Sequence, residues 1–169
     1  MSRIKLMVGD VFAVPIDENR VGVGQIVGKY GNSAYYFAIF DVVAPDGRSI
    51  DLDKSVLGRI LFLALSLDAK LFVGDWTVLG RRPVRAGMPL PAFKESVGVG
   101  DQIYVVDYSG ERRRPAVGIE STMLCNRKVV APVRLEKALR AKYGLEPWVA
   151  AYTDLAPEET NTTARFFRD

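Results

Sequence analysis

The feature that most constrains the fold is a series of three β-type segments in the first 43 residues. Residues 11–16 alternate large and small apolar side chains, and this period of two predicts a strand. The segments 21–29 and 34–43 follow after the polar turns 17–20 and 31–33, and the last is rich in aromatic and β-branched residues. The three segments therefore predict an antiparallel meander.

Glycines inside the second of these strands extend the prediction. Gly22, Gly24 and Gly28 lie within it, and such glycines are typical of the sharp bends that close a small barrel. We therefore expect the N-terminal half to form an SH3-like or partly open antiparallel barrel. The same glycines invite a phosphate-loop interpretation. However, Val23 and Tyr30 stand where that pattern needs a glycine and a serine or threonine, and a strand rather than a helix follows.

The remainder of the chain predicts further strands and one clear helix, so the expected fold class is α+β and predominantly β. Residues 60–67 favour a strand, although the run is short enough that a helix stays an alternative. The other expected elements are strands at 76–79, 102–108, 112–119 and 148–152, a helical turn at 69–73, and a frayed helix or tail at 157–169.

Residues 132–143 form the clearest expected helix. Pro132 suits the first turn, and Gly144 stands where a left-handed C-cap is expected. Glu136 and Arg140 are four residues apart and can form an ion pair. The residues expected on the buried face, at helical spacing, are Leu135, Ala138 and Leu139. We expect this C-terminal helix to pack on the additional strands.

The length of the chain, 169 residues, corresponds to one domain. Three prolines fall within residues 81–91, which we expect to form an irregular crossing loop. This loop is the position of a possible internal boundary. Since little chain follows it, we predict a single domain spanning residues 1–169.

Two absences exclude much familiar catalytic chemistry. The chain contains no histidine, so triads and metal sites that need histidine cannot form. Its one cysteine, Cys125, cannot form an internal disulfide or a cysteine metal cluster, and we expect it to be a small core residue. The acid pairs Asp17–Glu18 and Asp51–Asp53 lie in predicted turns, where solvated carboxylates are expected. We predict no catalytic residue, no cofactor and no metal; a carboxylate-dependent hydrolase is the enzymatic alternative.

Charge is unevenly distributed along a chain whose formal net charge is +3. Residues 111–142 contain nine basic and three acidic residues, whereas residues 143–169 contain two basic and five acidic ones. Such asymmetry suggests a surface field suited to a charged partner. The longest apolar run, 60–67, is too short to span a bilayer, and residues 1–8 contain no signal-peptide core. We therefore expect a cytoplasmic protein without a membrane partner.

Two segments of the first half resemble a known family. Gly9-Asp10-Val11-Phe12-Ala13-Val14-Pro15-Ile16, a polar turn and Gly22-Val23-Gly24-Gln25-Ile26-Val27-Gly28 are similar to the opening pattern of the immunity protein 26 family. The segment Gly74-Asp75-Trp76-Thr77-Val78-Leu79-Gly80-Arg81-Arg82-Pro83 resembles that family's tryptophan-bearing segment. The shared residues look like fold determinants, with Phe12 and Trp76 in the core. The family consists of bacterial immunity proteins of polymorphic toxin systems.

The resemblance implies a non-enzymatic protein that binds a cognate toxin made by the same cell and blocks it by occlusion. Arginine and aromatic side chains anchor many protein interfaces. The candidate contacts are Arg81, Arg82, Arg85, Arg112, Arg113 and Arg114, together with Tyr36 and Tyr108, which we expect to be exposed.

The main alternative is a small-barrel nucleic-acid-binding protein, in which basic residues contact phosphates and aromatic residues stack on bases. A net charge of +3 is weak for that role, and no recognised nucleic-acid-binding motif is present. The sequence makes no prediction of the oligomeric state.

Overall fold

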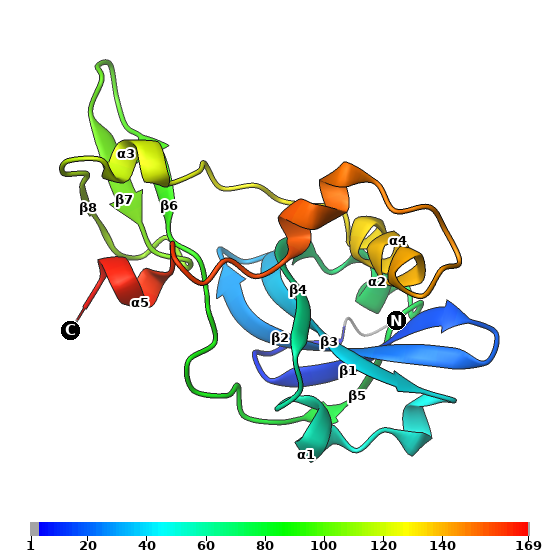
Figure 1. Ribbon diagram of the computed structural model, residues 1–169. Coiled ribbons are helices and arrows are strands. Elements are labelled where there is room, and N and C mark those ends of the chain that lie inside the picture. Colours follow the sequence, from blue (N-terminus) through cyan, green and yellow to red (C-terminus); the bar gives the residue numbers. More distant parts are fainter. Residues whose placement is uncertain (1–3, 169) are drawn as a thin grey trace.

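The larger of two antiparallel sheets has the strand order β4-β3-β2-β1-β5 (Figure 1). The structure, a computed structural model, describes residues 4–168; Met1–Arg3, the start of the segment 1–8 expected to contain no signal-peptide core, lie outside the described residues. The strands of this sheet are β1 (Asp10–Asp17), β2 (Arg20–Tyr30), β3 (Ala34–Ala44), β4 (Ile60–Leu67) and β5 (Thr77–Arg81).

The sheet is open. Within residues 4–168, β4 pairs with β3 and β5 pairs with β1, but β4 and β5 do not pair with each other. The expectation of an α+β, predominantly β fold with a partly open arrangement is therefore confirmed, and the closed form of an SH3-like barrel is not what the chain adopts. The strand at 60–67 is confirmed as well, because β3 supplies a partner along its length.

Glycine at position 24 has a specific packing role in the predicted meander. The β1–β2 register places Gly24 opposite Phe12, and a Cβ added to Gly24 would lie only 2.4 Å from Cζ of Phe12. The missing side chain therefore lets the Phe12 ring pass over β2. Phe12 stacks on Trp76 with ring centroids 5.3 Å apart, and Phe37 packs edge-on against the same indole at 5.7 Å. The prediction that Phe12 and Trp76 fill the core is confirmed.

The predicted helix at 132–143 is confirmed as α4 (Pro132–Lys142), which covers one face of the larger sheet (Figure 1). Leu135, Ala138 and Leu139 are all buried there, as expected. Gly144 has a φ of 76°, the left-handed conformation that favours glycine. The shorter helices are α1 (Leu52–Ser55), α2 (Ala69–Phe72), α3 (Glu120–Met123) and α5 (Thr163–Phe166), with 3-10 turns η1 (Gly47–Ser49) and η2 (Ala150–Leu155).

A second, smaller sheet projects from the side of the first (Figure 1). It has the order β6-β7-β8, with β6 (Phe93–Ser96), β7 (Ile103–Val106) and β8 (Arg113–Pro115). The chain reaches it through residues 82–92, the irregular crossing loop that the prolines predict. The sequence analysis did not predict β6, because its four residues show no clear apolar alternation. Whether the two sheets fold as a single domain stays a prediction.

Three expectations for the second half are wrong. Residues 148–152 are not a strand: Trp148 and Tyr152, four residues apart, pack against each other at 5.5 Å around the 3-10 turn η2. The expected strand at 112–119 is limited to β8, after which the chain turns into α3. Cys125 is exposed rather than part of the core.

Among residues 4–168, no helix is both long enough and apolar enough to cross a membrane.

Candidate partner-binding surface

The first group of candidate arginines joins the end of β5 and the start of the crossing loop to β1, α1 and the turn before β4. Nε of Arg81 lies 2.8 Å from Oδ1 of the buried Asp10, and Nε of Arg82 lies 2.6 Å from Oδ1 of Asp53. Nη1 of Arg85 donates a 2.6 Å hydrogen bond to the carbonyl oxygen of Gly58. These three cations therefore already have partners within the chain, and a bound molecule would contact only their exposed sides.

The second group lies on and beside β8. Nη1 and Nη2 of Arg114 each donate a 2.8 Å hydrogen bond to the carboxylate of Glu120. These bonds are the main reason that the pKa of Glu120 falls to about 2. Arg112 approaches Oδ2 of Asp107 at 3.5 Å, whereas Arg113 is exposed and lies over the Tyr104 ring at 5.5 Å. Of this group, Arg113 is exposed and the structure gives it no ion pair within residues 4–168, so its guanidinium is available to a partner.

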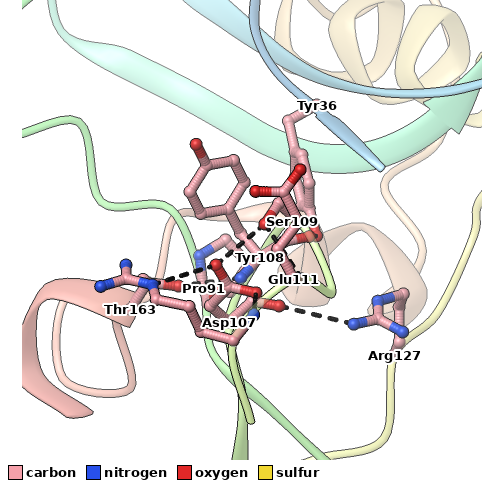
Figure 2. A network of polar contacts seen from close by, with 9 residues as sticks. Tyr36, Pro91, Asp107, Tyr108, Ser109, Glu111, Arg127 and Thr163 are labelled. Carbon is pink, nitrogen blue, oxygen red and sulfur yellow. Dashed lines mark hydrogen bonds and ion pairs between the residues drawn. The ribbon is translucent and has the colours of Figure 1, made fainter. Parts of the chain in front are cut away.

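The expectation that Tyr36 is exposed is wrong. Tyr36 is buried, and its hydroxyl donates a 2.7 Å hydrogen bond to the carbonyl oxygen of Tyr108 (Figure 2). The two rings pack edge to face at 5.8 Å, and Tyr108 is half-buried. Burial raises the pKa of the Tyr36 hydroxyl above its ordinary value, so this group remains a neutral donor. The structure thus brings the two candidate tyrosines together as a joint between the sheets.

This joint is completed by three residues that are not among the sequence-based candidates: Thr163, Asp107 and Arg127 (Figure 2). The backbone N–H of Tyr108 donates to Oγ1 of Thr163 at 2.9 Å, and the Thr163 hydroxyl donates to the carbonyl oxygen of Pro91 at 2.8 Å. The buried Asp107 accepts a 2.9 Å bond from the hydroxyl of Ser109 and so shapes the turn after β7. These bonds tie the smaller sheet, the crossing loop and α5 into one network.

Arg127 is the third of these residues. Its guanidinium lies 3.8 Å from the centre of the Tyr30 ring and 5.1 Å from that of Phe93, which belong to the larger and the smaller sheet respectively. Its Nη2 also reaches the carbonyl oxygen of Asp107 at 3.5 Å. A basic residue inside a locally basic stretch gives no sequence signal that distinguishes this clamp from a solvated charge.

Between the two sheets lies a cleft made of two adjoining cavities of about 420 and 630 Å³. Pro89 and Pro157 line both cavities, so the two are neighbours. We call this feature the β4-edge cleft, because Ile60 and residues 63–65 of the edge strand β4 form part of its wall. The crossing loop and residues 151–164 supply much of the rest. Clefts between packed units are frequent binding sites.

Charges of both signs line the β4-edge cleft. The basic residues are Arg59, Arg85, Lys128 and Arg134, and the acidic ones are Asp154, Glu158 and Glu159. Arg59, Lys128 and Arg134 are exposed, and the structure gives none of them an ion pair within residues 4–168. None of the arginines of the β8 group lines this cleft, so the structure keeps that group separate from it.

The members of both acid pairs are exposed, as expected, and Asp17 and Asp51 have local structural roles, whereas Asp53 pairs with the distant Arg82. Oδ2 of Asp17 pairs with Nη2 of Arg20 at 2.7 Å across the β1–β2 turn, and Oδ1 of Asp51 accepts from the backbone of Lys54 at the start of α1. In the described part of the chain, no three acidic or cysteine side chains gather where they could hold a metal ion.

The family model described as Immunity protein 26 matches residues 7–102 of this chain. The matched part contains all five strands of the larger sheet, the crossing loop and β6, and it ends at the connection to β7. No curated protein and no solved structure matches the chain.

Proposed function

This chain belongs to the immunity protein 26 family, and on that membership we propose that it binds a cognate bacterial toxin and neutralises it by occlusion. The toxin would be the product of a polymorphic toxin system in the same cell. The match over residues 7–102 is the single observation that carries the proposal. We place this encounter in the cytoplasm, where a self-made toxin would first be dangerous.

The buried carboxylates support a binding role rather than a catalytic one. Asp10 holds Arg81, Asp107 shapes the turn after β7, and Glu136 accepts a hydrogen bond from Trp76. Each is used by the fold itself, and none lines the β4-edge cleft. A general acid or base must reach a bound substrate. We therefore propose that the protein acts by binding alone.

The pairing of the arginines supports a protein partner over a nucleic acid. Arg81, Arg82, Arg112 and Arg114 each approach a carboxylate of the same chain within 3.5 Å. Neutralised guanidinium groups contribute little to the counterion release that dominates nucleic-acid binding. A protein interface uses a few anchors and mixed charge, which the β4-edge cleft offers.

The proposed contact surface consists of candidate residues that the structure leaves exposed to solvent. It contains the β4-edge cleft, the accessible guanidinium of Arg113, and the outward sides of the other candidate arginines. Tyr36 is excluded from direct contact because it is buried, and Tyr108 would contribute only its exposed part. An interface of standard size, about 1,600 Å² in total, would extend beyond the cleft onto neighbouring surface.

Co-expression tests the proposal. The chain is produced together with the toxin encoded by the neighbouring gene, in cells that die when the toxin is made alone. We expect rescued growth and a complex that copurifies through an affinity tag on either partner. If both proteins are soluble but do not copurify, and growth is not rescued, the proposal is refuted. Specific binding of DNA or RNA at low salt, without toxin binding, would favour the nucleic-acid alternative.

A further inference from the structure

The open edge of β4 suggests how the toxin is held. We propose that an extended segment of the toxin pairs with β4 inside the β4-edge cleft and adds a strand to the larger sheet. This inference rests on the proposed function and makes it more specific. It identifies the backbone of one strand, rather than the arginine groups, as the main recognition element.

The C-terminal end of β4 already pairs with an extended segment of its own chain. The backbone N–H of Val130 donates a 2.9 Å hydrogen bond to the carbonyl oxygen of Leu65, and the hydroxyl of Ser66 donates to the carbonyl oxygen of Val130 at 2.7 Å. Ser66 and Val130 form an isolated parallel bridge. The edge therefore accepts strand-like pairing, and the chain itself uses only its last residues.

Two residues earlier, the same edge is unoccupied. Backbone groups point alternately to the two sides of a strand, so those of Leu63 point to the same side as the Leu65 carbonyl, away from β3. Within residues 4–168, the structure gives the N–H and C=O of Leu63 no hydrogen-bond partner. Leu63 is half-buried and lines the β4-edge cleft. A donor and an acceptor without a partner in the described chain thus lie on the edge of β4 that borders the cleft.

The charges around the cleft favour a toxin segment over a second copy of this chain. Two copies joined by β4 through a twofold axis would run antiparallel, so Arg59 at the start of one β4 would approach Lys128 and Arg134 near the end of the other. These three cations have no ion pair in the described structure and would repel one another. A toxin segment that carries both carboxylates and basic side chains would instead complement these cations together with the acidic residues of the cleft, Asp154, Glu158 and Glu159.

The direct test is amide hydrogen exchange of the full chain, alone and with the purified toxin domain encoded by the neighbouring gene. We expect the Leu63 amide to exchange readily in the free protein and to become protected by at least about tenfold in the complex. The Ala64 amide, which faces β3, should be protected in both. If a complex forms and protection appears elsewhere, for example at Arg113, while Leu63 is unchanged, the inference is overturned but the proposed function stands.

Two other outcomes are distinct from that one. If the toxin domain does not bind at all, the proposed function fails and this inference fails with it. If Leu63 becomes protected as the free protein is concentrated, without toxin, the second copy occupies the edge and the inference is overturned.

Variants give an independent measurement. Leu63→Pro removes one outward N–H and keeps the β3 side of the strand, which is the arrangement that edge strands tolerate. Arg59→Glu reverses a charge of the cleft, and Lys142→Glu on the exposed end of α4 is its matched control. We expect the dissociation constant for the toxin domain to rise at least about tenfold for the first two variants and to change little for the control. Unchanged affinity of a folded Leu63→Pro would contradict the inference, and the exchange experiment decides if that variant does not fold.

Discussion

The indole Nε1 of Trp76 donates a 2.9 Å hydrogen bond to Oε2 of Glu136, and both residues are buried. Trp76 precedes β5 in the part of the chain that the family model matches, whereas Glu136 lies on α4, beyond the matched part. Lys70 at 3.7 Å and Arg140 at 3.3 Å compensate the Glu136 carboxylate. This bond therefore fastens the C-terminal helix to the core of the larger sheet.

Replacing Glu136 should destabilise the protein substantially. In Glu136→Ala the buried indole N–H loses its acceptor, and Lys70 and Arg140 each lose one of two carboxylate partners, so we expect a loss of about 2–4 kcal/mol in the free energy of unfolding. Glu136→Gln, which keeps an acceptor, should lose less. Urea denaturation followed by tryptophan fluorescence measures both. A loss for Glu136→Ala no larger than that for Glu18→Ala, an exposed turn residue, would contradict this interpretation.

The hydroxyl of Tyr36 should contribute to holding the two sheets together. Tyr36→Phe removes its 2.7 Å bond to the Tyr108 carbonyl and leaves a buried acceptor, so we expect a loss of about 1 kcal/mol in the free energy of unfolding. Amides of β7 should then exchange faster with solvent. Tyr104→Phe is the control, because the structure gives the Tyr104 hydroxyl no hydrogen bond within residues 4–168. Equal stability of the two variants would mean that the joint contributes nothing.

Two glycines of β2 should differ in their tolerance of a methyl group. A Cβ at Gly24 would lie 2.4 Å from Phe12, whereas at Gly28 the nearest atoms lie 3.2 Å away. Gly24→Ala must displace a ring that is stacked on Trp76, so we expect a cost of about 1–3 kcal/mol, and less for Gly28→Ala. Thermal unfolding of both variants checks the order. A Gly28→Ala variant that is the less stable of the two would contradict the packing described for Phe12.

Acid should weaken the pairing of Glu120 with Arg114. Because hydrogen bonds from Arg114 hold the pKa of Glu120 at about 2, below the ordinary value of 4.5, its carboxylate stabilises the fold fully above pH 4.5. That contribution is lost as the pH falls from 4.5 toward 2. We therefore expect the stability difference between the natural protein and Glu120→Gln to shrink across this range. A difference independent of pH, measured by urea denaturation, would show that Glu120 is not ionised in the fold.

Local patterns in the sequence predicted those strands and helices whose conformation depends on the spacing of neighbouring apolar residues. The alternation in 11–16 and the spacing of Leu135, Ala138 and Leu139 both gave confirmed elements, because side-chain periodicity reflects the face that is buried. Tyr36 was misjudged for the opposite reason. β3 is covered on both faces, on one by α4 and on the other mainly by α1 and the crossing loop, with Phe93 and Tyr108, so alternation along the strand carries no information about exposure.

The candidate site was less predictable because its contacts join distant parts of the chain. Arg81 and Asp10 are 71 residues apart, and Tyr36 and Tyr108 are 72 residues apart. The proline loop and the basic stretch 111–142 identified the arginines but not the carboxylates that neutralise them. The β4-edge cleft brings together β4, the crossing loop and the C-terminal segment, so no single stretch of sequence indicates it.

The central claim is that this chain neutralises a toxin by forming a complex with it. The most direct test is a titration of the purified toxin domain, at a concentration far above the dissociation constant, with increasing amounts of the purified chain. The account predicts that toxin activity falls in proportion to the added chain and is abolished at an equimolar ratio. Full inactivation by a small fraction of an equivalent would reveal catalysis, and unchanged activity at a large excess would show that this is not the toxin's inhibitor.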